Sequence, residues 1–353
     1  MKRWHLIIAI TLLFLSGCTH LGPKTVARDR FDYNTAISDS WKEQTLLNIV
    51  KIRYMDMPLF VDVASIVSGY TLQGTVNMAS TWSSDRAVQG DFFNMGSSGT
   101  FTDRPTITYK PITGQEFNKS FMTPIPPRAI LFLIQTGWPA DLIYKITVDS
   151  VNGLRGRVSG GTNARQADPR FNRMVKLMRL IQKSGVVGMR IIKGKDNLDT
   201  TVMFFHKQNI PPEVADARKE LGMILGLRPG VQDVKVVYGL IPKDDTEMAM
   251  LSRSMLQIMI ELATQVTVPP DHIAESRTVP TLAGGEDDFL ISINHSKEYP
   301  ENAFSAVRYR DYWFYVDDRD LISKRTFAFL MILFSMMETG GTEGLPLVTI
   351  PAG

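Results

Sequence analysis

The stretch from residue 70 to residue 82, YTLQGTVNMASTW, alternates between apolar and polar residues. The apolar positions are Tyr70, Leu72, Val76, Met78 and Trp82. Threonine, glutamine and asparagine occupy most of the positions between them. Successive residues of a β-strand lie on opposite faces, so this period of two predicts a strand with one apolar face and one polar face.

A second extended run, residues 100–110 (TFTDRPTITYK), follows a loop rich in serine, glycine and asparagine. The loop carries Phe92 and Phe93 near its tip. The two runs together predict a long β-hairpin over residues 70–110. Pro105 has no amide hydrogen, so we expect the return strand to lie at a sheet edge or to be interrupted by a bulge.

Helical and extended patterns interleave in the rest of the chain. Helices are predicted at residues 40–55, 126–136, 168–183, 211–227, 244–265 and 320–338. Strands are predicted at residues 142–148, 186–192, 200–206, 234–240, 289–295, 313–316 and 346–350. An N-terminal helix and a long hairpin followed by interleaved elements favour an α+β fold with mainly antiparallel strands.

The expected parts of the chain are a signal peptide (1–17), a tether (18–34), a helix and β-hairpin region (35–123) and an α/β region (124–353). Two segments that begin with the letters IPP, at residues 125 and 210, are each predicted to run helix, strand, helix, strand. This similarity suggests a faint duplication of residues 125–209 and 210–300.

The first residues are typical of a secretory signal, because Lys2 and Arg3 precede the apolar run Leu6 to Leu15. A helix of that run covers only about half of the ~30 Å hydrocarbon core of a bilayer, which argues against a permanent membrane helix. An uncleaved segment of a cytoplasmic protein is the remaining alternative.

The run Leu15-Ser16-Gly17-Cys18 resembles the lipobox of bacterial lipoproteins. The resemblance covers residues 1–18 only. It implies that a diacylglycerol is attached to the thiol of Cys18, that the signal is cut before this residue, and that a further acyl chain such as palmitate is added. Thr19 in place of an aspartate implies, in a Gram-negative cell, the periplasmic face of the outer membrane. An ordinary cleaved signal with a chance cysteine is the alternative.

Composition excludes several functions. Cys18 is the only cysteine, so its acylation would leave no thiol for disulfides, zinc sites or nucleophilic catalysis. The signal contains two of the 39 lysine and arginine residues and none of the 36 acids, which leaves a nearly neutral mature chain. Such a chain has no general attraction to nucleic acid.

No stretch contains a recognisable catalytic, cofactor-binding or metal-binding pattern, so we assign no such residue and no cofactor. His272, in DHIAE, is the one histidine of the mature chain with acids close in sequence, and a capped turn is the competing interpretation. The acids Asp317, Asp318 and Asp320 suggest calcium ligands, but they also fit the start of a helix. The lack of a catalytic pattern argues against an enzyme, and an active site spread over the sequence is the alternative.

Two surfaces are candidates for partner contacts. The predicted helix 168–183 has an apolar face, and its opposite face carries Arg170, Arg173, Lys176, Arg179 and Lys183. This basic face suits an anionic partner, unless acids elsewhere in the fold pair with it. The hairpin, with Phe92 and Phe93 at its tip, has strands long enough to cross an outer membrane. The second run would place Asp103, Pro105, Ile107 and Tyr109 on one face, which argues against lipid contact.

Three functional hypotheses follow. The first is a non-enzymatic scaffold or assembly factor, anchored through acyl chains on Cys18, that binds envelope proteins at the periplasmic face of the outer membrane. The second is an oligomeric export pore built from the hairpins at residues 70–110. The third is an envelope hydrolase whose site is spread over the sequence.

Overall fold

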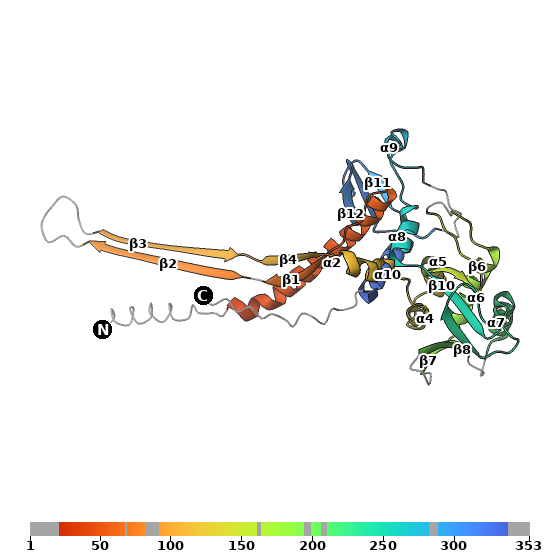
Figure 1. Ribbon diagram of the computed structural model, residues 1–353. Helices are drawn as coiled ribbons and strands as arrows, with labels where there is room; N and C mark the ends of the chain where they lie inside the picture. The colour runs from red at the N-terminus through yellow and green to blue at the C-terminus, as the bar shows by residue number, and fades with distance from the viewer. Residues whose placement is uncertain are drawn as a thin grey trace, which may run out of the picture. The chain divides into compact units, whose positions relative to one another are not determined.

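The computed structural model describes residues 21–67, 69–81, 92–160, 164–193, 199–205, 210–281 and 289–337. Cys18, His206 and the strand predicted at residues 346–350 lie outside them. The described elements form a mixed α+β fold with mostly antiparallel sheets, as predicted (Figure 1). No helix among these residues has both the length and the apolar character that crossing a membrane would require.

The chain divides into two compact units. Residues 59–112 form one unit, and the second unit contains the chain before Leu59 together with the chain from Thr113 onward. The N-terminal helix therefore groups with the later α/β elements, whereas the sequence placed it in one region with the hairpin. The reason is packing, since this helix lies against strands and helices from the C-terminal part of the chain.

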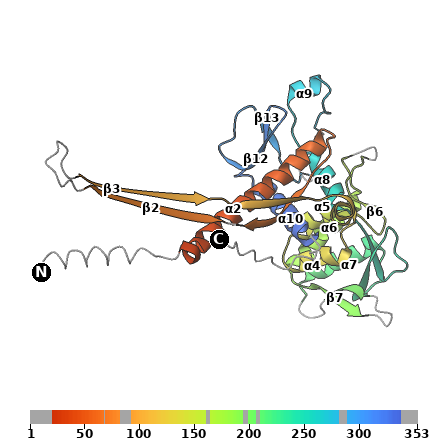
Figure 2. The same cartoon turned by 60° about the vertical axis from the view of Figure 1, so that its left-hand side comes forward.

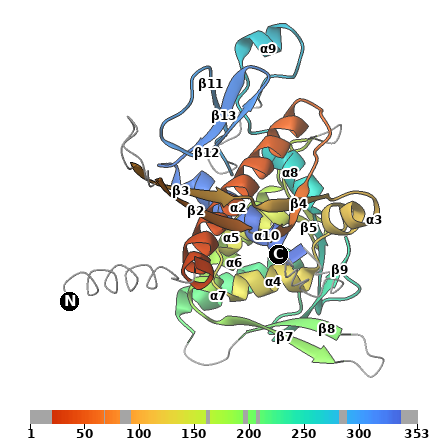
Figure 3. The same cartoon turned by 90° about the vertical axis from the view of Figure 1, so that its left-hand side faces the viewer.

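That helix, α2 (Leu21–Arg53), begins well before the predicted start at Ser40. Most of the segment expected to be a tether (18–34) is thus helical. Pro23 lies in the first turn, where a proline is tolerated because amide hydrogens there have no helical partner. Leu46, Ile49 and Val50 are fully buried in the last turns of α2. There α2 packs against a small sheet and helix α8 (Met255–Ala263) (Figure 3).

The main sheet has six strands in the order β6-β5-β10-β9-β8-β7. The strands are β5 (Val148–Val151), β6 (Leu154–Arg155), β7 (Val187–Lys193), β8 (Asp199–Phe205), β9 (Asp233–Tyr238) and β10 (Glu247–Ser252). Only β9 and β10 run parallel. The accompanying helices are α4 (Pro127–Gln135), α5 (Ala140–Thr147), α6 (Pro169–Lys183) and α7 (Pro212–Leu225).

The suggested duplication is not visible in this sheet. The segment at 125–209 runs α4, α5, β5, β6, α6, β7, β8, whereas the segment at 210–300 runs α7, β9, β10, α8, α9 (Pro270–Ala274), β11 (Asn294–Ser296). Strands β9 and β10 lie between β5 and β8, so both segments build one continuous sheet.

Two predicted elements have a different conformation in the structure. Residues 142–147, expected to be a strand, belong to α5, whose buried residues Ile143, Tyr144 and Ile146 face the core while α5 packs on α6. Tertiary contacts here outweigh the strand propensity of β-branched residues. The helix predicted at 244–265 is instead strand β10 followed by α8 (Met255–Ala263). β10 is buried on both faces, so its apolar residues do not alternate with polar ones. Their spacing therefore resembled the apolar face of a helix.

Several predicted elements are confirmed. Asp168 caps α6, since its carboxylate accepts a hydrogen bond from the Arg170 amide at 2.8 Å. Helix α10 (Leu321–Met337) buries Phe327, Phe329 and Leu333. The strand predicted at 313–316 is β13 (Tyr312–Asp317), which lies at the centre of an antiparallel sheet in the order β11-β13-β12. β11 (Asn294–Ser296) covers only the end of the strand predicted at 289–295, and β12 (Ala303–Tyr309) was not predicted. The shorter helical segments are α3 (Gly114–Phe117), the π-helix η1 (Asn118–Met122) and α9 (Pro270–Ala274).

The unit at residues 59–112 consists of the predicted hairpin and a shorter strand pair. Strands β2 (Tyr70–Thr81) and β3 (Phe92–Asp103) pair along their whole length and lie side by side (Figures 1 and 2). We call β2 and β3 together the ribbon. Strand β1 (Val61–Val67) pairs with β4 (Thr106–Pro111). The return strand is broken at Arg104 and Pro105, as the proline predicted.

Candidate functional site

The ribbon contains almost no charge. Strand β2 has no charged residue, and the only charged residue of β3 is its last one, Asp103. Charged residues make up 21% of the whole chain, so their absence from two strands of 12 residues each is a marked local bias. Exposed strands in water normally carry lysines or other charges that keep other chains from pairing with them.

The register gives the ribbon two different faces. Residues directly opposite each other in a ladder share a face, and the faces alternate along each strand. By this register, the apolar face contains Tyr70, Leu72, Gly74, Val76, Met78, Ser80, Phe93, Met95, Ser97, Gly99, Phe101 and Asp103. The polar face contains Thr71, Gln73, Thr75, Asn77, Ala79, Thr81, Phe92, Asn94, Gly96, Ser98, Thr100 and Thr102. One face is therefore rich in large apolar residues, and the other is mostly polar and uncharged.

The register also changes the argument against lipid contact. Asp103 is at the last position of β3, opposite Tyr70, and so lies at the end of the ribbon away from the loop. Ile107 and Tyr109 belong to β4, which pairs with β1 and not with β2. The residues that argued against lipid contact therefore lie at the end of the ribbon or outside it, and not in its middle.

Phe92 and Phe93 occupy the first two positions of β3, opposite Thr81 and Ser80. They lie at the loop end of the ribbon but on opposite faces. They therefore do not share one face of the ribbon, although each places an aromatic residue at this end.

The ribbon has no core of its own. Val76, in the middle of β2, is 51% exposed, and the neighbouring residues Thr75 and Asn77 are exposed as well. Within the described part of the chain, no third strand pairs with β2 or β3. A hairpin of two strands is only marginally stable in water, so the ribbon is suited to an environment other than water alone.

The basic face predicted on α6 is largely compensated by acids. Arg170 pairs with Asp168 at 3.1 Å, and Arg179 Nε lies 3.4 Å from Asp141. Arg173 donates two hydrogen bonds of 2.6 Å to Glu220 of α7, which hold the pKa of that carboxyl below its usual value. Lys176 and Lys183 are exposed on the same helix. These pairs support the interpretation that acids elsewhere in the fold neutralise this face.

His272 lies in a packed cluster and not in an open site. It is 3% exposed, and its Nδ1 is 2.7 Å from the hydroxyl of Tyr54, at the end of α2. Burial raises the pKa of Tyr54 to about 12, so the phenol stays protonated and can donate to Nδ1. Asp271 accepts a hydrogen bond of 2.8 Å from Tyr312, whose ring contacts both His272 and His295. The cluster joins α2 and α9 to the three-stranded sheet.

The described part of the chain contains cavities among its α/β elements and along α2. One of about 320 Å³ lies between α4, α6 and β7 and is lined by Leu131, Met178 and Met203 with Lys183. A groove of about 750 Å³ lies along α2 and β12, and a third cavity, of about 470 Å³, is lined by residues of α7. Neither His272 nor His295 lines any of the three.

The acids at 317–320 act as helix-start and pairing groups. Asp320 accepts hydrogen bonds from the amides of Ile322 and Ser323 at the start of α10, both at 3.1 Å. Asp317 pairs with Arg319, and Asp318 pairs with Lys324. Among the described residues, no group of three or more histidines, cysteines or acids is arranged to hold a metal ion.

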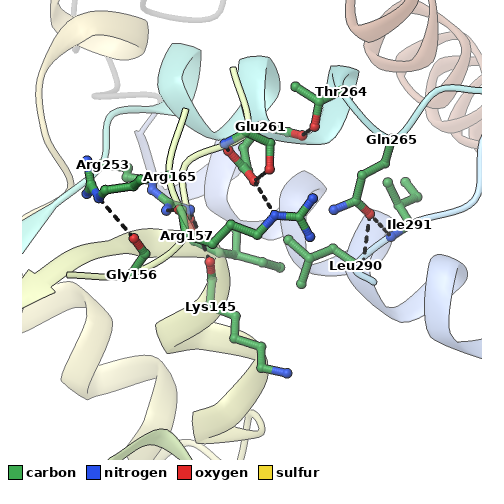
Figure 4. A network of polar contacts seen from close by, with 12 residues as sticks. Lys145, Gly156, Arg157, Arg165, Arg253, Glu261, Thr264, Gln265, Leu290 and Ile291 are labelled. Carbon is green, nitrogen blue, oxygen red and sulfur yellow. Dashed lines mark hydrogen bonds and ion pairs between the residues drawn. The ribbon is translucent and has the colours of Figure 1, made fainter. Parts of the chain in front are cut away.

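A buried polar network around Arg253 and Glu261 was not indicated by any sequence pattern (Figure 4). Arg253, 4% exposed, donates to the main-chain carbonyls of Lys145, Ile146 and Arg157. Glu261 accepts hydrogen bonds of 2.7 and 2.6 Å from the amide and hydroxyl of Ser159. Burial lowers the pKa of Arg253, and in the described part of the chain its guanidinium donates to main-chain carbonyls. This network fixes loops between α5, β6 and α8, and the cavity beside Arg157 and Glu261 is only about 20 Å³, which is too small for a substrate.

In comparisons with known proteins, no family model, no curated protein and no solved structure matches this chain. The functional interpretation therefore depends on the residues and on their geometry.

Proposed function

We propose that this chain is a lipid-anchored envelope protein that inserts its ribbon into the outer membrane and acts without catalysing a reaction. The observation that carries the proposal is the register of β2 and β3, which separates a largely apolar face from an uncharged polar face. This is the pattern of a strand pair that contacts lipid on one side and water on the other.

The dimensions and the ends of the ribbon agree with this proposal. At about 3.3 Å per residue, a strand of 12 residues extends roughly 40 Å, which crosses a ~30 Å hydrocarbon core even when it is tilted. Aromatic residues are enriched where membrane strands meet the lipid headgroups. Tyr70 and Phe101 lie near one end of the ribbon, and Phe92 and Phe93 lie at the other.

The proposed lipid anchor would lie in the same membrane as the ribbon, the outer membrane. Several acyl chains on Cys18 would hold the mature chain stably, since each buried methylene contributes about 0.8 kcal/mol. Thr19 supports the outer membrane as the location in a Gram-negative cell. An anchor of this kind keeps the ribbon at a high local concentration beside the bilayer and so favours insertion.

The scaffold hypothesis remains the second candidate, because one observation favours it. Both outer edges of the ribbon present backbone groups that no strand of the described chain pairs with, and such an edge can add to a sheet of a partner protein. The two candidates differ in what the apolar face touches: lipid in the first, protein in the second. No observation on the described residues favours the hydrolase.

A pair of single-cysteine variants tests the proposal. Val76→Cys lies on the apolar face and Thr75→Cys lies on the polar face, one residue away at the same depth. Each is labelled with an environment-sensitive fluorophore in the anchored protein, reconstituted in liposomes. We expect a lipid-soluble quencher to act mainly on the Val76 label and an aqueous quencher mainly on the Thr75 label.

Equal quenching of both labels from the aqueous phase would overturn insertion. Protection of the Val76 label from both quenchers, combined with crosslinking to one defined envelope protein, would also overturn it and favour the scaffold. A variant that lacks residues 83–99 is the control, since it removes the segment between the strands and the first two thirds of β3 and should give neither pattern.

A further inference from the structure

We infer that each outer edge of the ribbon pairs with the ribbon of another copy of this chain, so that the copies close into a ring around a water-filled lumen. This inference rests on the proposed insertion. It names the partner, a second copy, and the surface, the outer edges of β2 and β3.

Backbone hydrogen bonding requires a partner at these edges. In an antiparallel ladder, alternate residues direct their N–H and C=O groups toward the paired strand, and the remaining residues direct them outward. About half of the 12 residues of each ribbon strand therefore present both groups outward. Each group left without a partner in hydrocarbon is strongly unfavourable, so a lone ribbon cannot remain in a bilayer.

The described chain does not supply that partner itself. Strands β1 and β4 have 7 and 6 residues, and they pair with each other. Every other described strand has at most 7 residues and belongs to a separate sheet. A second copy provides a strand of 12 residues with the same alternation of apolar and polar positions.

The sequence of the ribbon also lacks the features that prevent edge pairing. Between Tyr70 and Thr81, and between Phe92 and Thr102, there is no charged residue and no proline. Exposed edges of soluble sheets usually carry lysine, proline or a bulge for this purpose. The unbroken register from Tyr70 to Thr81 also excludes a bulge within the ribbon. Two ribbons can thus approach without charge repulsion.

The geometry of repeated pairing leads to a ring. If β2 of one copy pairs with β3 of the next, the contact joins two different edges and repeats in the same way at each copy. A sheet that closes on itself leaves no edge in the lipid. The polar face then lines the lumen, and its threonine, serine, glutamine and asparagine residues give a hydrophilic wall without charge.

A disulfide walk tests this inference. Asn77→Cys in β2 is combined in turn with a single cysteine at Asn94, Gly96, Ser98, Thr100 or Thr102 of β3, all on the same face. Gly96 is the partner of Asn77 within one chain, so the combination of Asn77→Cys with Gly96→Cys should give an internal disulfide and confirm the register. After mild oxidation in liposomes, we expect one or two of the other combinations to give a ladder of covalent multimers.

Matched controls and a second measurement separate this inference from the proposed function. The combination of Asn77→Cys with Ser97→Cys, which lies on the opposite face, should give no ladder. Liposomes that contain the anchored protein should release an uncharged hydrophilic dye, and the variant without residues 83–99 should not. Absence of both ladder and release, while the Val76 label stays quenched from the lipid, overturns the ring and leaves insertion intact. Loss of that lipid quenching overturns the proposed function itself.

Discussion

Val76 of β2 lies directly opposite Ser97 of β3, in the middle of a ladder of paired residues that runs without a break from Tyr70 and Asp103 to Thr81 and Phe92. A slip of one residue in this register would bring the residues of the apolar face of one strand opposite the polar face of the other. The amphipathic character of the ribbon is therefore a property of the pairing as well as of the two sequences.

A lysine at the centre of the ribbon should distinguish its faces. Val76→Lys places a charge on the face proposed to contact lipid, where such a substitution costs about 2–4 kcal/mol near the bilayer midplane. Thr75→Lys is the matched control on the polar face and should insert normally. The comparison is the fraction of each variant that stays in the membrane after extraction. Cys18 is replaced by alanine in both variants. Equal extraction of the two would contradict the assignment of the faces.

Arg253 should be one of the most sensitive positions for folding. Arg253→Ala removes three hydrogen bonds that the guanidinium donates to main-chain carbonyls, and a hydrogen bond to a charged group contributes about 1.5–3 kcal/mol. We expect the free energy of unfolding in urea to fall by roughly 3 kcal/mol or more. Arg190→Ala is the control, because Arg190 pairs with Asp233 on the surface and should contribute within about 1 kcal/mol. Similar losses for the two variants would contradict the structural role of the network.

Two tyrosine hydroxyls provide a second matched pair. Tyr54→Phe removes the 2.7 Å hydrogen bond to His272 and should lower the free energy of unfolding by about 1–2 kcal/mol. The hydroxyl of Tyr144 is buried without a hydrogen-bond partner among the described residues, and burial raises the pKa of this phenol. Tyr144→Phe should therefore leave stability unchanged or increase it. A larger loss for Tyr144→Phe than for Tyr54→Phe would refute this reading of the cluster.

Stability should depend on pH through His295. Burial lowers the pKa of His295 below its ordinary value of 6.5, so the unfolded chain takes up a proton at a higher pH than the folded protein. Stability is then complete above about pH 6.5 and decreases as the pH falls through the folded pKa. Urea midpoints from pH 8 to pH 5 should show this decrease, and His295→Gln should reduce its slope between pH 6.5 and 5. An identical slope in both proteins would exclude His295 as the cause.

The acylation of Cys18 can be tested by direct labelling. Cells that express the chain and are grown with labelled palmitate should give a labelled protein, and Cys18→Ala should abolish the label. Because the chain has one cysteine, the denatured mature protein should also fail to react with a maleimide. Reaction of the mature protein with the maleimide would show a free thiol and contradict the lipid anchor.

The local signals of the sequence identified some elements well. Pro105 marked the break between β3 and β4, and Asp168 with Pro169 marked the start of α6. These signals are local because a missing amide hydrogen or a capping carboxylate acts on neighbouring backbone groups. The apolar run in β10 carried no such local information, since a strand buried on both faces lacks a period of two. Its assignment depended on neighbours in the sheet.

How well each candidate surface could be predicted depended on whether its partners lie nearby in the sequence. Arg173 appeared unpaired in the sequence, because its partner Glu220 lies on another helix. In the sequence His272 is notable only for the acids beside it, whereas Tyr54, more than two hundred residues away in the chain, packs against it. In the ribbon, by contrast, the two strands are near neighbours in sequence, and the alternation already predicted each strand's faces.

Features that act locally can be recognised in the amino-acid sequence: the resemblance of residues 15–18 to a lipobox, the single cysteine, the uncharged alternating strands and the break at Pro105. Only the folded chain shows how β2 and β3 are matched, where Asp103 lies, and which acids compensate the basic face of α6. Register, burial and ion pairing depend on contacts that no short stretch of sequence contains. Those contacts turn an alternating sequence into a ribbon with two chemically different faces.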